Sequence, residues 1–179
     1  MLAKRRGIVD YLLSSSAPRL PRVDASSKPS ARAGSLSVDF EDGYVVLVPE
    51  GKGFDAAVRL LWAKKDSSRA RPLEPGKYRV RRYVLARTDG AGTEWNVWAT
   101  GEGREVTVHE GKETRLDVDQ DVSLKMRAER KGGRVAVQGS FAGDSGMGLS
   151  LVKGKARVVV GWRISSGESV LAKGECAYG

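Results

Sequence analysis

The chain of 179 residues contains one cysteine and one histidine. The single cysteine, Cys176, excludes an intrachain disulfide and a cysteine-rich zinc site. The Gly-Asp-Ser-Gly loop at 143–146 has the residues found around a serine nucleophile. Such a serine needs a histidine base held by a carboxylate, and His109 lacks the sequence surroundings of that base. We therefore expect a glycine-rich hairpin loop, no enzyme activity and no cofactor.

The sequence also lacks a long hydrophobic run. No stretch approaches the roughly 20 apolar residues that cross a bilayer as a helix, so no membrane span is predicted. Near the start, Lys4, Arg5 and Arg6 resemble the charged region of a secretory signal. The apolar run that follows is short and contains Asp10. We expect a short amphipathic helix or an irregular start in this segment, in place of a signal peptide.

Acidic residues are outnumbered, with 22 Asp and Glu against 31 Lys and Arg, which gives a formal net charge of +9. More than half of this excess lies in residues 1–34, where Ser, Pro and Ala dominate from residue 14 onward. Few apolar groups in this segment could offset the entropy cost of ordering it. The sequence predicts a flexible basic arm or linker. Its Lys4, Arg5 and Arg6 could contact nucleic acid, anionic lipid or acidic polysaccharide.

From residue 35 onward, apolar and polar residues alternate. Leu36, Val38 and Phe40 alternate with Ser37 and Asp39, which is the pattern of a half-buried strand. Turn signals separate about eleven or twelve such segments at intervals of roughly 8–12 residues, which is typical of sandwiches and barrels. No segment with helical periodicity follows. The sequence therefore predicts an all-β fold of mainly antiparallel sheets.

The predicted architecture is an antiparallel β-sandwich preceded by the basic arm. Two arrangements stay open. The sandwich is either two small Ig-like or transthyretin-like units in tandem, at 36–119 and 120–179, or one continuous unit over 36–179. In the last third of the chain, apolar strand faces are expected in three segments: 122–128, 135–141 and 158–164.

Three segments resemble a known family: Val-Pro-Glu-Gly at 48–51, Leu-Glu-Pro-Gly-Lys-Tyr-Arg-Val at 73–80, and Val-Thr-Val-His-Glu-Gly-Lys-Glu-Thr-Arg-Leu at 106–116. With them, residues 44–118 resemble the small β-sandwich modules of bacterial envelope proteins, of the PEGA or transthyretin-like kind. The chain departs from the PEGA pattern at Lys52, where alanine is expected, and in a long insert at 53–71. The resemblance implies a non-catalytic spacer or interaction module, commonly located outside the cytoplasm.

The densest basic patch of the predicted sandwich consists of Lys77, Arg79, Arg81 and Arg82, with Arg69 and Arg71 in the preceding loop. Alternate residues of a strand share one face, so the strand cations form a row that could follow a phosphate or sulfate backbone. The alternative is a solvated outer face whose cations pair with neighbouring carboxylates.

Tryptophans suggest a second kind of site. Trp98 and Asn96 share one face of a predicted strand, and Trp95 lies on the other face. Core packing accounts for Trp62, Trp95 and Trp162. Trp98 is then expected on the outside or at an edge between sheets, and an exposed indole beside an amide could form a platform for stacking a sugar.

Three aspartates, Asp117, Asp119 and Asp121, have the spacing found at the start of a calcium loop. The sixth and twelfth positions of such a loop need Gly and Glu, whereas this chain has Val122 and Ala128. We therefore expect a strand end or a junction between units at this place, and no metal site.

The leading hypothesis is a non-enzymatic β-sandwich scaffold or interaction module that contacts a protein or an anionic polymer. One alternative is a carbohydrate-binding module centred on Trp98 and Asn96. Another is a nucleic-acid-binding accessory protein that uses residues 1–34. An enzyme is the least favoured class, because acid–base and nucleophilic mechanisms each need a coherent set of groups.

Overall fold

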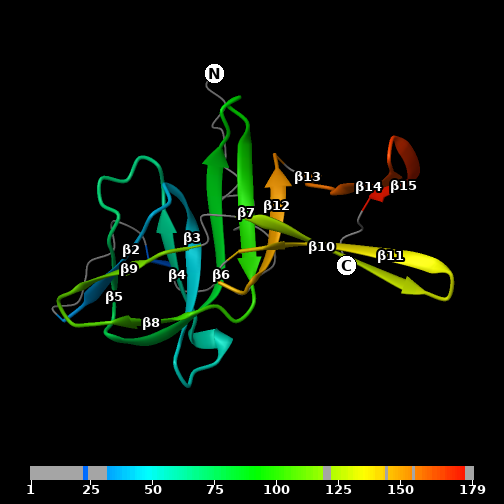
Figure 1. Cartoon of the computed structure of the whole chain (residues 1–179). Helices are drawn as coiled ribbons and strands as arrows, with labels where there is room; N and C mark the ends of the chain where they lie inside the picture. Colours follow the sequence, from blue (N-terminus) through cyan, green and yellow to red (C-terminus); the bar gives the residue numbers. More distant parts are fainter. Residues whose placement is uncertain (1–21, 24–31, 119–121, 144, 155, 176–179) are drawn as a thin grey trace.

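The structure, a computed structural model, describes residues 22–23, 32–118, 122–143, 145–154 and 156–175. It is an all-β fold with predominantly antiparallel sheets, which confirms the predicted fold class (Figure 1). Within these ranges the one helical element is the 3-10 turn η1 (Phe54–Ala56). No helix in them is long and apolar enough to cross a membrane. The strands are β1 (Arg22–Val23), β2 (Gly34–Val38), β3 (Asp42–Pro49), β4 (Val58–Trp62), β5 (Arg71–Leu73), β6 (Gly76–Thr88), β7 (Glu94–Thr100), β8 (Glu105–Val108), β9 (Glu113–Leu116), β10 (Ser123–Lys131), β11 (Arg134–Ala142), β12 (Gly148–Lys153), β13 (Ala156–Arg157), β14 (Gly161–Ser166) and β15 (Ser169–Glu175).

The strands form a large sheet, a small sheet and a separate hairpin. The large sheet has ten strands in the order β1-β4-β3-β6-β7-β12-β11-β10, with β8 paired to β6 and β13 paired to β12. The small sheet has the order β5-β2-β9. Two pairs are parallel, β1 with β4 and β2 with β9. Strand β1 falls inside the segment predicted as a basic arm, of which 1–21 and 24–31 lie outside the described residues.

The main hydrophobic core lies between the large sheet and the small sheet. Leu36 of β2 and Leu116 of β9 are buried in one cluster with Leu47, Tyr83 and Leu85 of the large sheet. These residues occupy alternate positions of their strands, as the period-two pattern predicts. A fully buried leucine contributes about 1.5–3 kcal/mol relative to an exposed one. Contact between the two sheets is therefore the main stabilising interaction of the sandwich.

The large sheet is apolar on its other face as well. A second buried cluster consists of Tyr44, Val46, Val48, Ala57, Leu61 and Val84, with Trp98 packed against it. Burial on both faces explains why the middle of β3 is a continuous apolar run, without the alternation of a one-sided strand.

One glycine brings β3 and β6 close together. A Cβ atom on Gly43 would lie 2.0 Å from the carbonyl oxygen of Val84, and the φ of Gly43 is +148°. Only glycine adopts such a conformation without strain. The turn that begins β3 therefore depends on the absence of a side chain at this position.

A β-bulge sets the direction of the predicted basic row. The β3–β6 register shifts between Val46 and Leu47, and Arg81 is the extra residue of β6 at that point. Val48 pairs with Arg79 on one side of the bulge, and Val46 pairs with Arg82 on the other. Paired residues share a face of the sheet, so the bulge lets cations on both sides of it lie on one face.

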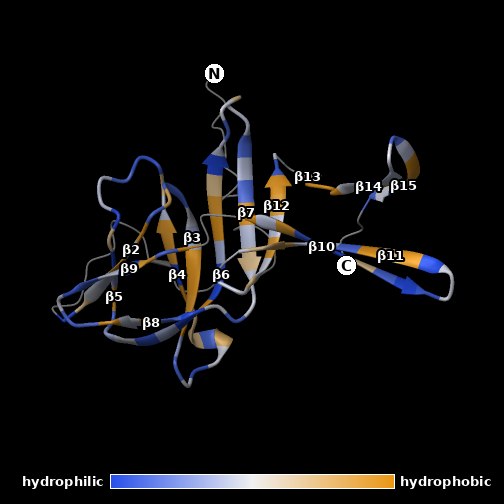
Figure 2. Ribbon diagram, viewed as in Figure 1, coloured by the Kyte–Doolittle hydropathy of each residue, from blue (hydrophilic) through white to orange (hydrophobic). Residues whose placement is uncertain are grey.

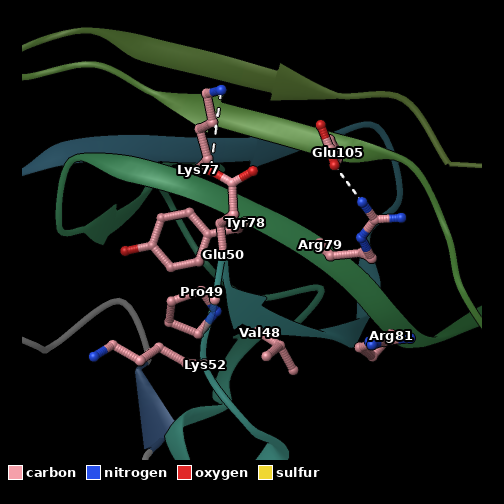
Figure 3. A pocket seen from close by; sticks show the side chains of 10 residues that line it. Val48, Pro49, Glu50, Lys52, Lys77, Tyr78, Arg79, Arg81 and Glu105 are labelled. Carbon is pink, nitrogen blue, oxygen red and sulfur yellow. Dashed lines mark hydrogen bonds and ion pairs between the residues drawn. The ribbon is translucent and has the colours of Figure 1, made fainter.

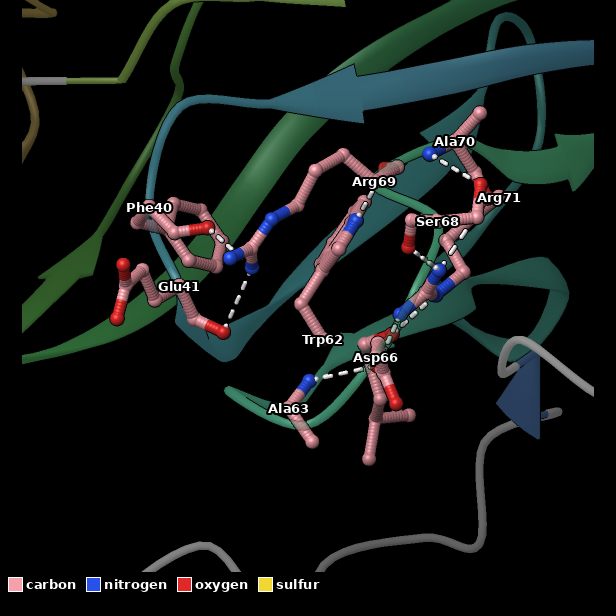
Figure 4. A network of polar contacts seen from close by, with 10 residues as sticks. Phe40, Glu41, Trp62, Ala63, Asp66, Ser68, Arg69, Ala70 and Arg71 are labelled. Carbon is pink, nitrogen blue, oxygen red and sulfur yellow. Dashed lines mark hydrogen bonds and ion pairs between the residues drawn. The ribbon is translucent and has the colours of Figure 1, made fainter.

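The loop between β4 and β5 folds around a buried arginine (Figure 4). The side chain of Arg71 is 0% exposed, and its guanidinium pairs with Asp66. Arg71 Nε also donates to the carbonyl oxygen of Leu61 at 2.5 Å, and Nη1 donates to that of Ser68 at 2.7 Å. The guanidinium lies over the ring of Trp62, 5.4 Å from its centroid. The prediction that Arg71 extends the surface basic patch was wrong, because the loop supplies its own carboxylate and carbonyl partners.

Strand β12 connects the last third of the chain to the sandwich. It pairs with β7 along its whole length. The sequence pattern did not indicate this strand, and it places strands of the two predicted units in one sheet. The predicted junction at 119–121 lies outside the described residues.

The remaining C-terminal strands extend away from the sandwich. β11 pairs with β12 only at Phe141 and Ala142, so most of the β10–β11 hairpin projects beyond the sheet (Figure 1). The strand predicted at 158–164 begins only at Gly161, as β14, which pairs with β15. All of β10 is exposed, whereas the sequence pattern predicted that one of its faces is buried.

Candidate functional site

The β10–β11 hairpin is closed by a two-residue glycine turn. Lys131 pairs with Arg134 at the end of the ladder, and Gly132 and Gly133 between them have φ of 53° and 80°. Positive φ at both central positions defines a type I′ turn, whose twist matches the twist of the flanking strands. This turn fixes the register of the whole hairpin.

One face of the hairpin is apolar. We call this surface the hairpin apolar face; its apolar side chains are Leu124, Met126, Ala128, Val135 and Val137, and Arg130 lies on the same face opposite Val135. Leu124 and Met126 are each 45% exposed, and Val135 is 54% exposed. Figure 2 shows apolar segments along the projecting strands. At the base, Phe141 and Val122 pack against the main core and anchor the hairpin to the sandwich.

The hairpin is strongly basic. Residues 122–143 hold five cations, Lys125, Arg127, Arg130, Lys131 and Arg134, and one anion, Glu129. Lys131 lies 3.5 Å from Glu129. The other four cations form no ion pair with any residue that the structure describes. Their charge is therefore available to an acidic ligand.

One edge of the hairpin has no neighbouring strand among the residues that the structure describes. In the described part of the chain, β10 pairs with β11 alone and ends the large sheet. Unpaired backbone N–H and C=O groups at such an edge form a template for another strand. The hairpin thus combines apolar side chains, unpaired cations and a free edge in one place.

The predicted basic row on β6 lines a shallow cavity of about 140 Å³ at the end of β3 (Figure 3). Its cations are paired with carboxylates on neighbouring segments: Lys77 with Glu50 at 4.0 Å, Arg79 with Glu105, and Arg81 with Glu102 at 2.6 Å. Hydrogen bonding from Arg81, together with its charge, lowers the pKa of Glu102. Arg82 is exposed on the same face. The structure thus brings the four predicted cations together, and ion pairs offset the charge of three of them.

The face around Trp98 carries donors without acceptors. Asn96 is 1% exposed, and Trp98 is half-buried against the second cluster. Within the described residues, Trp98 Nε1, Asn96 Nδ2 and Arg59 Nε are buried without a hydrogen-bond partner. A buried donor that lacks a partner costs about 1–3 kcal/mol. Because these donors are buried, a ligand on this face would reach them only after a movement of the side chains.

Trp95 lies on the opposite face of β7, at the strand end. Its Nε1 donates to Asp89 Oδ2 at 2.8 Å, and Lys153 Nζ lies 4.9 Å from the centroid of its ring. Trp95 is therefore held by polar partners at a partly exposed position, in contrast to the buried Trp62.

The remaining candidates do not form a reactive group in the described structure. Ser145 Oγ accepts a hydrogen bond from Met147 N at 3.2 Å, and His109 is exposed after β8. No group of three or more potential metal ligands occurs in the described ranges. Several predicted residues lie outside those ranges: Lys4, Arg5, Arg6, Asp119, Asp121 and Cys176.

Sequence reasoning did not predict the exposed hairpin. Its signal was present as alternation over 122–128 and 135–141, which we interpreted as two half-buried strands. Comparison of the chain with known protein families, with curated proteins and with solved structures finds no match. The proposals that follow therefore depend on the geometry of the molecule itself.

Proposed function

We propose that the protein is a non-enzymatic interaction module that holds an acidic protein partner on the β10–β11 hairpin. The observation that carries this proposal is a nine-residue strand that is exposed along its whole length and has large apolar side chains on one face. A two-stranded hairpin is marginally stable alone in water. Grouped exposed apolar residues usually mark an interaction surface. A partner on the hairpin apolar face would remove this surface from water.

Charge selects the kind of partner. The hairpin has five cations and one anion. A second copy would bring the same positive charge against it. The β14–β15 hairpin (161–175) holds two cations and two anions, so it offers no compensating charge. An acidic surface on another protein complements both the apolar face and the cations.

The rest of the chain suits a scaffold role. The core between the two sheets and the ion pairs of β6 give a rigid body from which the hairpin projects. The resemblance of residues 44–118 to the PEGA-like or transthyretin-like modules of bacterial envelope proteins agrees with this role, and we include that class and location in the proposal.

The test is photo-crosslinking in the full chain. A photoreactive residue at position 126 should capture a partner through an acidic, apolar segment, and one at the exposed position 112 should not. The captured partner is then identified, purified and titrated. We expect Arg127→Glu with Arg134→Glu to weaken its binding at least tenfold. Equal capture at both positions, or binding unchanged by charge reversal, contradicts the proposal.

Carbohydrate binding at Trp98 and Asn96 is a second candidate, favoured by their unpartnered buried donors. After a side-chain movement that uncovers these donors, sugar hydroxyls would supply the acceptors and the indole would supply a stacking surface. Oligosaccharide titration should then change tryptophan fluorescence in the wild type and in the control Trp95→Phe, with weaker binding in Trp98→Phe, which lacks the Nε1 donor. Equal affinity in Trp98→Phe and Trp95→Phe would count against this site.

A further inference from the structure

The glycine turn determines which backbone groups β10 presents at its free edge. Lys131 and Arg134 flank a two-residue turn, so they form a pair that exchanges both hydrogen bonds within the hairpin. Such pairs alternate along an antiparallel ladder with pairs whose N–H and C=O groups point outward. By this alternation, the outward groups of β10 belong to four residues: Leu124, Met126, Ala128 and Arg130.

We infer that the partner binds as an added antiparallel β-strand on the free edge of β10, through a segment in which apolar and acidic residues alternate. This inference rests on the proposed function and specifies its geometry. A strand on this edge places every second side chain on the hairpin apolar face, beside Leu124 and Met126. The side chains between them lie on the other face, beside Lys125 and Arg127, where carboxylates make favourable cross-strand pairs.

The edge of β10 fits this partner better than the edge of β11. β10 has four cations, Lys125, Arg127, Arg130 and Lys131, and one anion, Glu129, whereas β11 has no charged residue after Arg134. The base of β11 is also paired with β12. An acidic strand therefore has complementary charge only along β10.

The same cations disfavour pairing between copies of this chain. Natural sheets protect their edges with lysine, proline or bulges. The β10–β11 ladder has an uninterrupted register and no proline. If two β10 edges met in an antiparallel pair centred on Met126, Lys125 of one copy would face Arg127 of the other. In that register the edge repels its own copy and accepts an acidic strand.

A labelled peptide tests this geometry with the full-length protein. The probe has about eight residues of alternating valine and glutamate, and fluorescence anisotropy reports its binding. We expect it to bind, and we expect peptides of alternating valine and lysine, or of a valine block followed by a glutamate block, to bind at least tenfold more weakly. Equal binding by the block peptide would overturn strand addition.

Backbone methylation of the peptide gives a control that leaves the protein unchanged. In the proposed pair the valine N–H groups donate to β10, and the glutamate N–H groups point away. Methylating the valine amides should weaken binding by about tenfold or more, and methylating the glutamate amides should change it by less than about twofold. Equal effects of the two methylation patterns would refute the geometry.

A proline variant tests the choice of edge, with a serine variant at the same position as its matched control. Ala128→Pro removes an outward N–H of β10, whereas Ala128→Ser keeps it. Proline is tolerated where the N–H points away from the ladder, and circular dichroism verifies the fold. We expect Ala128→Pro to abolish peptide binding and Ala128→Ser to retain it. If Ala128→Pro binds the peptide normally, strand addition at β10 is wrong, while the crosslinking result decides the proposed function separately.

Discussion

The buried arginine of the β4–β5 loop gives the sharpest stability prediction. In Arg71→Met the side chain keeps much of its volume and its contact with Trp62, but loses every donor. The carboxylate of Asp66 then has no cation, and the carbonyl oxygens of Leu61 and Ser68 each lose a donor. Because the guanidinium is fully buried, water cannot replace it without opening the loop.

Removing one partner of a buried ion pair typically costs about 3–5 kcal/mol, because the other charge stays buried and unpaired. Asp66 is partly accessible, with 17% of its side chain exposed, so we expect Arg71→Met to cost about 3–4 kcal/mol. Arg69 provides a matched control in the same loop. It donates to the carbonyl oxygens of Phe40 and Glu41 from a partly exposed position, so Arg69→Met should cost about 1 kcal/mol.

The assay is urea unfolding of the full chain, followed by tryptophan fluorescence. A double-mutant cycle with Asp66→Asn separates the ion pair from general damage to the loop. With both charges removed, the loss in Arg71→Met/Asp66→Asn should fall short of the sum of the single losses by at least about 1.5 kcal/mol. If the single losses are additive, or if Arg71→Met costs no more than Arg69→Met, the buried pair does not stabilise the loop as reasoned.

Three further predictions concern single side chains. Gly43→Ala should destabilise the protein by about 2–5 kcal/mol in urea unfolding, because its Cβ would lie 2.0 Å from a carbonyl oxygen at positive φ; Gly90→Ala, whose Cβ has nothing within 4 Å, should change stability by less than about 0.5 kcal/mol. Burial raises the pKa of Asp42 above 3.8, so Asp42→Asn should stabilise the fold at neutral pH. This gain in stability should shrink as the pH falls through the raised pKa of the folded state. A gain that is constant with pH would contradict this prediction. The hydrogen bond from Trp95 lowers the pKa of Asp89 below 3.8, so the acid-induced change in Trp95 fluorescence should be centred below pH 3.8 and be absent in Asp89→Asn.

Alternation in the sequence was enough to predict most strands of the sandwich, with β12 as an exception. Leu36 and Val38 are buried in the main core between the two sheets, as their spacing indicates. The sequence pattern placed Arg71 on the surface, because a run of charged residues is typical of a solvated loop. In the structure the side chain of Arg71 is buried. The partner carboxylate, Asp66, lies in that same run, and only the folded loop places it against the guanidinium.

The basic row on β6 shows a different limit. Lys77, Arg79 and Arg81 share a face as predicted, but a bulge of β6 opposite β3 was needed to place Arg82 with them. Their partners, such as Glu102 and Glu105, come from the segment before β8 and from β8 itself. A row of cations in one strand therefore predicts a surface patch. The net charge of that patch depends on ion pairs with other segments, which the sequence does not specify.

The β10–β11 hairpin shows why the site could be recognised only in three dimensions. Alternation with a period of two residues predicts which side chains share a face of a strand, and Leu124, Met126 and Ala128 do share one. It does not state whether another layer covers that face. For β3 the layers are supplied within the fold, and its apolar residues are buried on both sides. For β10, no layer in the described part of the chain covers the apolar face. The same alternation that builds the core of the sandwich thus leaves, at the end of the large sheet, an apolar surface that is exposed in the described structure.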